Sequence, residues 1–417
     1  MSGLEVWIED ASLGGQALVG HLTKSVSMTG DTVSFEYSQA WLDDAGPVRS
    51  FQLDPQLFLS GGALYSSHGA DRLTGSFVDC SPDRWGKMLM DRREAIEAKE
   101  EDRKVRNLRD WDYLVGVNDE SRMGALRLRD GDGMFRDTRG LASPPIAHLR
   151  ELEAVAAAVE RGDPADTPQM RKWLKSLVAP GASLGGARPK AGFRDVDGSL
   201  WLAKFPSADD RFDVGLWELL TYQLSLDAGI AMPPAKSLGL SDRGHTYAVT
   251  RFDRSEGSRR AFASAMTLLD ATQSEGRSYL DLIAVIEAGG TSTTINDDLE
   301  QLFRRVMFNI LIGNRDDHLR NHGFLREGNG WRLSPAFDVN PNPDRHDHVL
   351  AIDESDTSPD TALLLSTADY YRLSRKTSAA IAEQVRAAVR GWEKRARAVG
   401  LRSVEVDVMR GVIDPER

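Results

Sequence analysis

The chain has 417 residues, of which 41% are hydrophobic and 28% charged, and this composition predicts a globular protein of two or three domains. Its formal net charge of -11 argues against a protein that binds nucleic acid by itself, although a local basic patch stays compatible with it. Cys80 is the single cysteine, which excludes an intrachain disulfide and any zinc site built on two or four cysteines. The N-terminus lacks the basic and apolar regions of a signal peptide, and no window approaches the roughly 18 apolar residues of a membrane span. We therefore expect a cytoplasmic protein.

Residues 3–80 are expected to form mostly strands. Every second residue over 4–8 is aliphatic, which is typical of a strand with one buried face, and paired glycines supply turns between such segments. A charged helix is expected over 83–104, and a second helix and a closing strand should follow it. We predict a β-rich N-terminal domain over residues 1–140, and the sequence assigns it no chemistry.

A glycine-rich stretch, GASLGGARPK, spans residues 181–190. Glycines allow backbone N–H groups to approach a phosphate, and Lys190 could add positive charge there. The stretch is not a Walker A motif, and a plain hairpin turn is the alternative. Lys204 follows about one strand later, in WLAKFP, at the place where kinases carry the lysine that pairs with the phosphates. A surface lysine that serves solubility is the alternative for Lys204.

The next elements predict the second half of a small mixed lobe. Residues 214–228 form an amphipathic pattern that ends at Gly229, and Glu218 lies early in this helix. Kinases pair such a glutamate with the phosphate-binding lysine, whereas the alternative is an acid that favours the first helical turn. A buried strand follows, YAVTRFDR, leaving at Arg251. We predict that residues 141–262 form this lobe.

From residue 264 the pattern is helical, and we predict a helical lobe over 263–417. The expected helices cover residues 278–288, 297–312, 369–373 and 375–399, the last ending at Gly400.

The most informative stretch is FNILIGNRDDHLRNHGFL, residues 308–325, in which an apolar helix leads into a polar loop. Asp316 and Asn321 have the Asp-to-Asn spacing of the kinase catalytic loop, in which the aspartate accepts the hydroxyl proton and the asparagine holds a metal ion. Asp338 follows a hairpin that turns at Gly328-Asn329-Gly330, as the second metal-binding aspartate of kinases does.

Two other interpretations of this stretch are a zinc-protease site and a solvated loop. His318 and His322 form H-x-x-x-H, but a zinc protease needs glutamate in the second position, where Leu319 stands. The second interpretation is a solvated, charged loop without chemistry. It accounts for Arg315, Asp317 and Arg320, but not for the kinase-like order of Asp316, Asn321 and Asp338. Since the kinase spacing excludes Asp317 from the position of the base, we expect Asp317→Asn to have a mild effect.

Together these motifs resemble the HipA-type serine/threonine kinases, the toxin half of bacterial toxin–antitoxin pairs. The resemblance covers about residues 180–341, is looser in the N-terminal part, and rests on five pieces in the family's order: SLGGARPK, WLAKFP, TRFDR, IGNRDDHLRNHGFL and AFDVNP. It implies an α+β fold with a kinase-like two-lobed core that binds ATP and Mg²⁺.

The resemblance also implies roles for individual residues. Asp316 would be the catalytic base, Asn321 and Asp338 the metal ligands, Glu218 the residue that orients the lysine, and Ser183 the site of an inactivating autophosphorylation. The expected ATP contacts come from the glycine-rich loop, the two strands and the catalytic stretch: Gly185, Gly186, Ala187, Arg188, Lys190, Lys204, Thr250, Arg251, Phe252, His318, Asn321, Phe337 and Asp338.

The implied partners are a helix-turn-helix antitoxin and a protein substrate, for which the family suggests an aminoacyl-tRNA synthetase. DNA would be contacted mainly through the antitoxin, and no membrane is involved. The alternative function is a kinase-like module that binds a partner or acts as a corepressor without essential catalysis.

Overall fold

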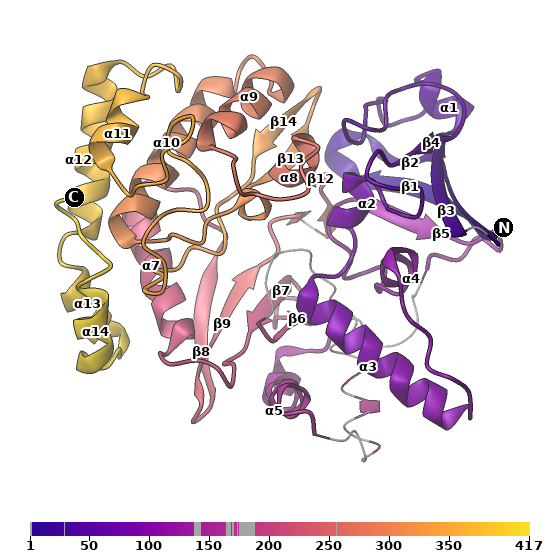
Figure 1. The fold of residues 1–417 in the computed structure, drawn as a ribbon, viewed down its shortest axis with the longest axis horizontal. Helices are drawn as coiled ribbons and strands as arrows, with labels where there is room; N and C mark the ends of the chain where they lie inside the picture. Colours follow the sequence, from indigo (N-terminus) through magenta and orange to yellow (C-terminus); the bar gives the residue numbers. More distant parts are fainter. Residues whose placement is uncertain are drawn as a thin grey trace. The chain divides into compact units, whose positions relative to one another are not determined.

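The computed structural model describes residues 2–417 except 29, 137–142, 164–167, 169–170, 173, 175–187 and 256. The chain forms two compact units. The first unit comprises Met1–Ala208 and Thr250–Ala263, and the second comprises Asp209–Val249 and Ser264–Arg417 (Figure 1). The three domain ranges expected from the sequence stay predictions.

The first unit contains an antiparallel five-stranded sheet in the order β4-β3-β2-β1-β5 (Figure 1). Leu4, Val6 and Ile8 on β1 are at most 2% exposed, so the alternation in the sequence does mark one buried face. This confirms the β-rich character predicted for the N-terminal part. The strands are β1 (Ser2–Asp10), β2 (Gly15–Ser27), β3 (Gly30–Tyr37), β4 (Leu64–Tyr65) and β5 (Leu126–Arg129).

Helices and a second group of strands complete the first unit. Asp83 caps α3 by accepting a hydrogen bond from the N–H of Gly86 at 2.8 Å. The helices are α1 (Gln39–Leu42), α2 (Gly75–Asp79), α3 (Arg84–Glu100), α4 (Asp110–Val115) and α5 (Leu149–Glu160), with 3-10 turns at Ala11–Leu13 and Ile146–His148. The strands are β6 (Lys190–Arg194), β7 (Leu200–Lys204), β10 (Arg254–Ser255) and β11 (Ser258–Arg259), and β12 (Phe262–Ser264) lies where the chain enters the second unit.

The second unit is mainly helical, and helix α10 (Ile295–Ile312) is almost entirely buried after Asp298. Helix α12 packs against α10 and α7, and α13 packs against α7 (Figure 1). The helices are α7 (Val214–Asp227), α8 (Ala265–Leu268), α9 (Tyr279–Gly289), α10, α11 (Thr361–Ser366), α12 (Arg375–Val389), α13 (Trp392–Val399) and α14 (Ser403–Met409), with a 3-10 turn at Leu319–Asn321. The strands are β8 (Ala235–Ser241), β9 (Gly244–Thr250), β13 (Gly323–Glu327) and β14 (Gly330–Leu333).

Two helix predictions for this unit are wrong. The helix expected over 375–399 is broken after Val389, because Gly391 adopts φ +75° and starts a new helix. The helix expected over 369–373 is a turn, since Arg372 has φ +57°, which a right-handed helix cannot include. The helices expected over 214–228, 278–288 and 297–312 and the hairpin at Gly328-Asn329-Gly330 are confirmed.

Gly313 ends α10 directly before the polar loop, and its replacement by alanine is expected to destabilise the protein. Its φ is +70°, and an added Cβ would lie 2.4 Å from Val412 Cγ1 and 2.9 Å from the Val412 carbonyl oxygen. The left-handed conformation alone costs a non-glycine residue about 1–2 kcal/mol. Gly391→Ala is the matched control, because Gly391 has φ +75° but open space around it. Chemical denaturation should show the larger loss for Gly313→Ala, and equal losses would contradict the steric argument.

Candidate active site

The polar loop that follows α10 holds Asp316 at the surface of the second unit. Gly313 turns the chain out of the helix, and its carbonyl accepts from the N–H of Asn342 at 2.9 Å. The side chain of Asp316 is 55% exposed, and its Oδ1 lies 3.1 Å from Arg345 Nε. An accessible carboxylate in this loop is compatible with a base that receives a proton from a bound hydroxyl group.

Asp317, next to it, points into the protein, so its interpretation as a solvated residue is wrong. It is 3% exposed, and its Oδ2 accepts hydrogen bonds from Tyr279 Oη at 2.7 Å, Asn309 Nδ2 at 2.9 Å and His322 Nε2 at 2.9 Å. Burial would raise the pKa of the Asp317 carboxyl, but the charge and hydrogen bond of His322 and the hydrogen bond from Tyr279 hold this pKa below its usual range.

Asn321 is 6% exposed, and its Oδ1 has no hydrogen-bond partner among the described residues. A buried amide oxygen without a partner is costly unless a bound group satisfies it. Carbonyl and carboxylate oxygens are the ligands that Mg²⁺ prefers, so Asn321 Oδ1 fits the metal role expected from the sequence. His318 Nδ1 and Asn340 Oδ1 likewise lack partners within the described part of the chain.

The segment around Asp338 lies beside this loop. Phe337 and Val339 line a small cavity of about 10 Å³ together with Asp317, Asn321 and His322. Asp338 itself is partly exposed and has φ +58°, a left-handed conformation that non-glycine residues seldom adopt. Backbone strain of this kind concentrates at functional sites, where the surrounding structure enforces it.

Helix α7 is tied to the same segment. Thr221 Oγ1 donates to the carbonyl of Val339 at 2.7 Å. Glu218 lies about one helical turn before Thr221 on the same helix and is 4% exposed. The second unit therefore brings four elements together: the Asp316 loop, the Asn321 turn, the Asp338 segment and the helix that carries Glu218.

The first unit carries the expected lysines. Lys204 ends β7, is 7% exposed and pairs in register with Lys190 on β6. The ammonium of Lys190 lies 2.5 Å from Asp83 Oδ2, and the Lys190 carbonyl accepts from Trp85 Nε1 at 3.1 Å. These contacts fix the N-terminus of α3 against β6. The ammonium of Lys190 is therefore already paired with a carboxylate, which makes it less suited to bind a phosphate.

Thr250, Arg251 and Phe252 are among the residues that the sequence predicts to contact ATP. The N–H of Arg251 donates to the carbonyl of Leu200 at 3.0 Å, and the Arg251 carbonyl accepts from the N–H of Arg254 at 3.2 Å. The Arg251 guanidinium is held by Asp253, which is fully buried and whose pKa is lowered by Arg251 and Arg254 against the effect of burial. Both backbone groups of Arg251 are thus engaged within the unit. Thr250 and Phe252 are half-buried, as is Arg188.

The remaining expected site residues lie outside the described residues: Ser183, Gly185, Gly186 and Ala187.

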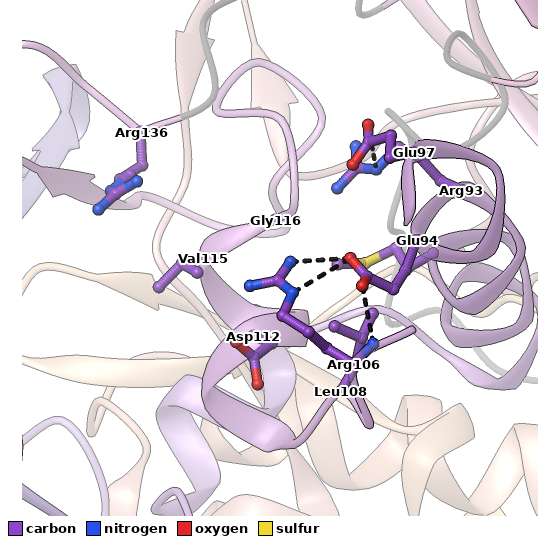
Figure 2. Close-up of a pocket in the computed structure, with 10 residues that line it drawn as sticks. Arg93, Glu94, Glu97, Arg106, Leu108, Asp112, Val115, Gly116 and Arg136 are labelled. Atoms are coloured by element: carbon purple, nitrogen blue, oxygen red, sulfur yellow. Dashed lines mark hydrogen bonds and ion pairs between the residues drawn. The ribbon is translucent and has the colours of Figure 1, made fainter. Parts of the chain in front are cut away.

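A second hollow, of about 260 Å³, lies in the first unit between α3 and α4 (Figure 2). Four of its charged side chains pair with one another: Arg93 with Glu97, and Arg106 with Glu94. Glu94 is buried and accepts from Arg106 Nη2 at 2.9 Å and from Arg103, so that these arginines hold the pKa of Glu94 well below its usual range. Arg93 lies 3.9 Å from Glu97. Since these carboxylates and arginines pair with each other, the hollow does not define a class of ligand.

In the described part of the chain, no group of three or more His, Cys, Asp or Glu residues could hold a metal ion. Of the two histidines of the H-x-x-x-H pattern, His322 is buried and its Nε2 lies 2.9 Å from Asp317 Oδ2. No helix among the described residues is long and apolar enough to cross a membrane.

Comparisons with known proteins identify the class. The structure resembles HipA of Shewanella oneidensis MR-1, solved with HipB and its operator DNA, at a TM-score of 0.63 and 16% identity over 98% of this chain and 94% of that chain. The fold is therefore the kinase-like fold of HipA, as the sequence predicts. A weaker likeness, to the proinflammatory kinase CtkA of Helicobacter pylori, has a TM-score of 0.34 and 13% identity over 53% of this chain and 93% of that chain, and carries no argument.

Residues 182–392 match the HipA-like C-terminal domain family. The chain belongs to this family. A search of curated proteins finds no match.

Proposed function

We propose that the protein is an ATP-dependent serine/threonine protein kinase and the toxin of a toxin–antitoxin pair. The observation that carries the proposal is the second unit's arrangement: an exposed Asp316, a buried Asn321 whose Oδ1 has no partner in the described structure, and a left-handed Asp338 in the segment beside them. This set meets the needs of phosphoryl transfer, which depends on positioning and on charge neutralisation.

In this proposal each residue has one task. Asp316 accepts the proton of a serine or threonine hydroxyl, and Asn321 and Asp338 hold Mg²⁺, which neutralises charge on the phosphates. Lys204 places the α- and β-phosphates with Glu218 as its orienting partner. The 183–190 loop covers the phosphates, and the remaining ATP contacts stay with the residues expected from the sequence. Among these expected ATP contacts, Lys190 has the least structural support, because Asp83 already binds its ammonium group.

The partners in this proposal are a helix-turn-helix antitoxin and a protein substrate, with DNA reached through the antitoxin. The operator complex of the Shewanella HipA supports this choice. The alternative is a corepressor without essential catalysis. ATP consumption by the purified protein, compared with that of Asp316→Ala, separates the two, since a corepressor would show the same low turnover in both.

Ser183 is expected to become phosphorylated and to switch the kinase off. Phosphate would bring about -1.5 to -2 charges into a loop that must surround a triphosphate, so it should oppose ATP binding. The alternative is a serine that merely caps a turn. Intact-mass analysis after incubation with ATP and Mg²⁺ should show one phosphate that maps to Ser183 and is absent from Asp316→Asn. Unchanged ATP affinity in the phosphorylated protein would remove the switch.

A further inference from the structure

Two pairs of residues in the catalytic loop share the same spacing. The proposed function assigns Asp316 and Asn321 to the reaction, and Asp317 and His322, each one residue further along, are buried and bind each other at 2.9 Å. The side chain of Asp316 is 55% exposed, whereas those of Asp317 and His322 are 5% and 3% exposed. Asp317 and His322, which we call the inner pair, therefore connect the loop at the two positions directly after Asp316 and Asn321.

The inner pair is anchored to two helices. Tyr279 lies in the first turn of α9 and Asn309 in the last turns of α10, and both donate to Asp317 Oδ2. Asn309 also accepts from Asn314 Nδ2 at 3.0 Å, which holds the start of the loop. Charge-assisted hydrogen bonds to a buried carboxylate are about twice as strong as neutral ones, so one anion fixes three donors from separate elements.

The backbone between the two pairs is held as well. The N–H of Leu319 donates to Ser274 Oγ at 3.1 Å, and the N–H of Asn321 donates to the carbonyl of His318 at 2.8 Å. The carbonyl of His322 accepts from the N–H of Ala265 at 2.8 Å. These hydrogen bonds fix the backbone of the segment. The side-chain hydrogen bonds from Tyr279, Asn309 and His322 all end on the buried carboxylate of Asp317.

We propose that Asp317 is a positioning residue, which sets the separation of Asp316 and Asn321 by binding His322, Tyr279 and Asn309. This inference rests on the proposed kinase function and adds a residue to it. It also replaces the expectation that Asp317→Asn has a mild effect, since that expectation followed only from the exclusion of Asp317 from the position of the base and did not include its buried contacts. Asp317 does not touch the reacting atoms, and it acts through the geometry of its neighbours.

The test compares Asp317→Asn with Asp298→Asn. Asp298 is the matched control because it is also buried in the second unit, 2% exposed, and accepts from the Leu333 N–H at 3.1 Å and from Arg332, away from the loop. A displacement of about 1 Å in a catalytic group costs up to about 10²-fold. Asp317→Asn should therefore lower kcat by on the order of 10-fold to 10²-fold and raise the Mg²⁺ concentration for half-maximal rate, with an unchanged KM for the protein substrate. Asp298→Asn should lower Tm and leave kcat per folded molecule unchanged.

Hydrogen exchange in the nucleotide-free protein gives a readout that does not depend on activity. Peptides over 314–322 should exchange faster in Asp317→Asn, whereas Asp298→Asn should affect only peptides over 323–333. Should Asp317→Asn fail to fold, Tyr279→Phe removes one donor at nearly constant volume and should give the same changes at smaller size. Unchanged exchange over 314–322, or faster exchange with unchanged kcat, would overturn the proposal. If the wild-type protein transfers no phosphate, the proposed function fails, and the exchange data alone then decide whether Asp317 fixes the loop.

Discussion

Asp316→Asn is expected to lower phosphoryl transfer by about 10²–10⁴-fold, the usual contribution of a positioned base. Asparagine has the same shape and the same hydrogen-bonding reach but cannot take the proton of the attacking hydroxyl. The residue is exposed and lies outside the buried contacts of the loop, so the fold should be unaffected. ATP binding should remain measurable by titration, because the proposed metal ligands Asn321 and Asp338 are unchanged.

The control for this variant is Asp344→Asn. Asp344 is a neighbouring acid whose side chain is 67% exposed and pairs with Arg211 at 2.5 Å, and an exposed ion pair of this kind contributes about 0–1 kcal/mol. Its activity should match that of the wild type. Full activity in Asp316→Asn, measured by transfer of labelled phosphate to a protein substrate, would remove Asp316 from the position of the base.

The sequence predicts those parts of the site that depend on local order along the chain. The spacing of Asp316 and Asn321, the hairpin before Asp338 and the amphipathic helix with Glu218 are patterns within short windows, and the structure contains the helix and the hairpin. Each follows from hydrophobic periodicity and turn residues, which act over a few residues. The roles of these residues stay predictions.

The partners of buried charges could not be predicted, because they come from distant parts of the chain. Tyr279 lies 38 residues from Asp317, and Asp83 lies 107 residues from Lys190. Nothing in the local pattern separates the buried Asp317 from the exposed Asp316, since the two are adjacent and identical. Only the fold decides which carboxylate faces water, and this decides which one can act as a base.

Asp338→Gly is expected to abolish Mg²⁺-dependent ATP binding while leaving the stability of the protein within about 1 kcal/mol of the wild type. Glycine adopts the observed φ of +58° without strain, which offsets the greater entropy of glycine in the unfolded chain. The carboxylate, however, is lost, and with it the proposed metal ligand. Asp338→Asn, which tolerates the same backbone but carries no charge, should weaken Mg²⁺-dependent binding without abolishing it.

Asp270→Gly supplies the comparison for the backbone. Asp270 is exposed, belongs to the same unit and has φ +48°, so the substitution changes strain and entropy in the same way without touching the site. Chemical denaturation should give similar stabilities for the two glycine variants. ATP titrations with and without Mg²⁺ should show Mg²⁺-dependent binding for Asp270→Gly and none for Asp338→Gly. A protein in which Asp338→Gly still binds ATP in a Mg²⁺-dependent manner would hold its metal elsewhere. The left-handed backbone at Asp338 would then be a feature of the turn, with no bearing on phosphoryl transfer.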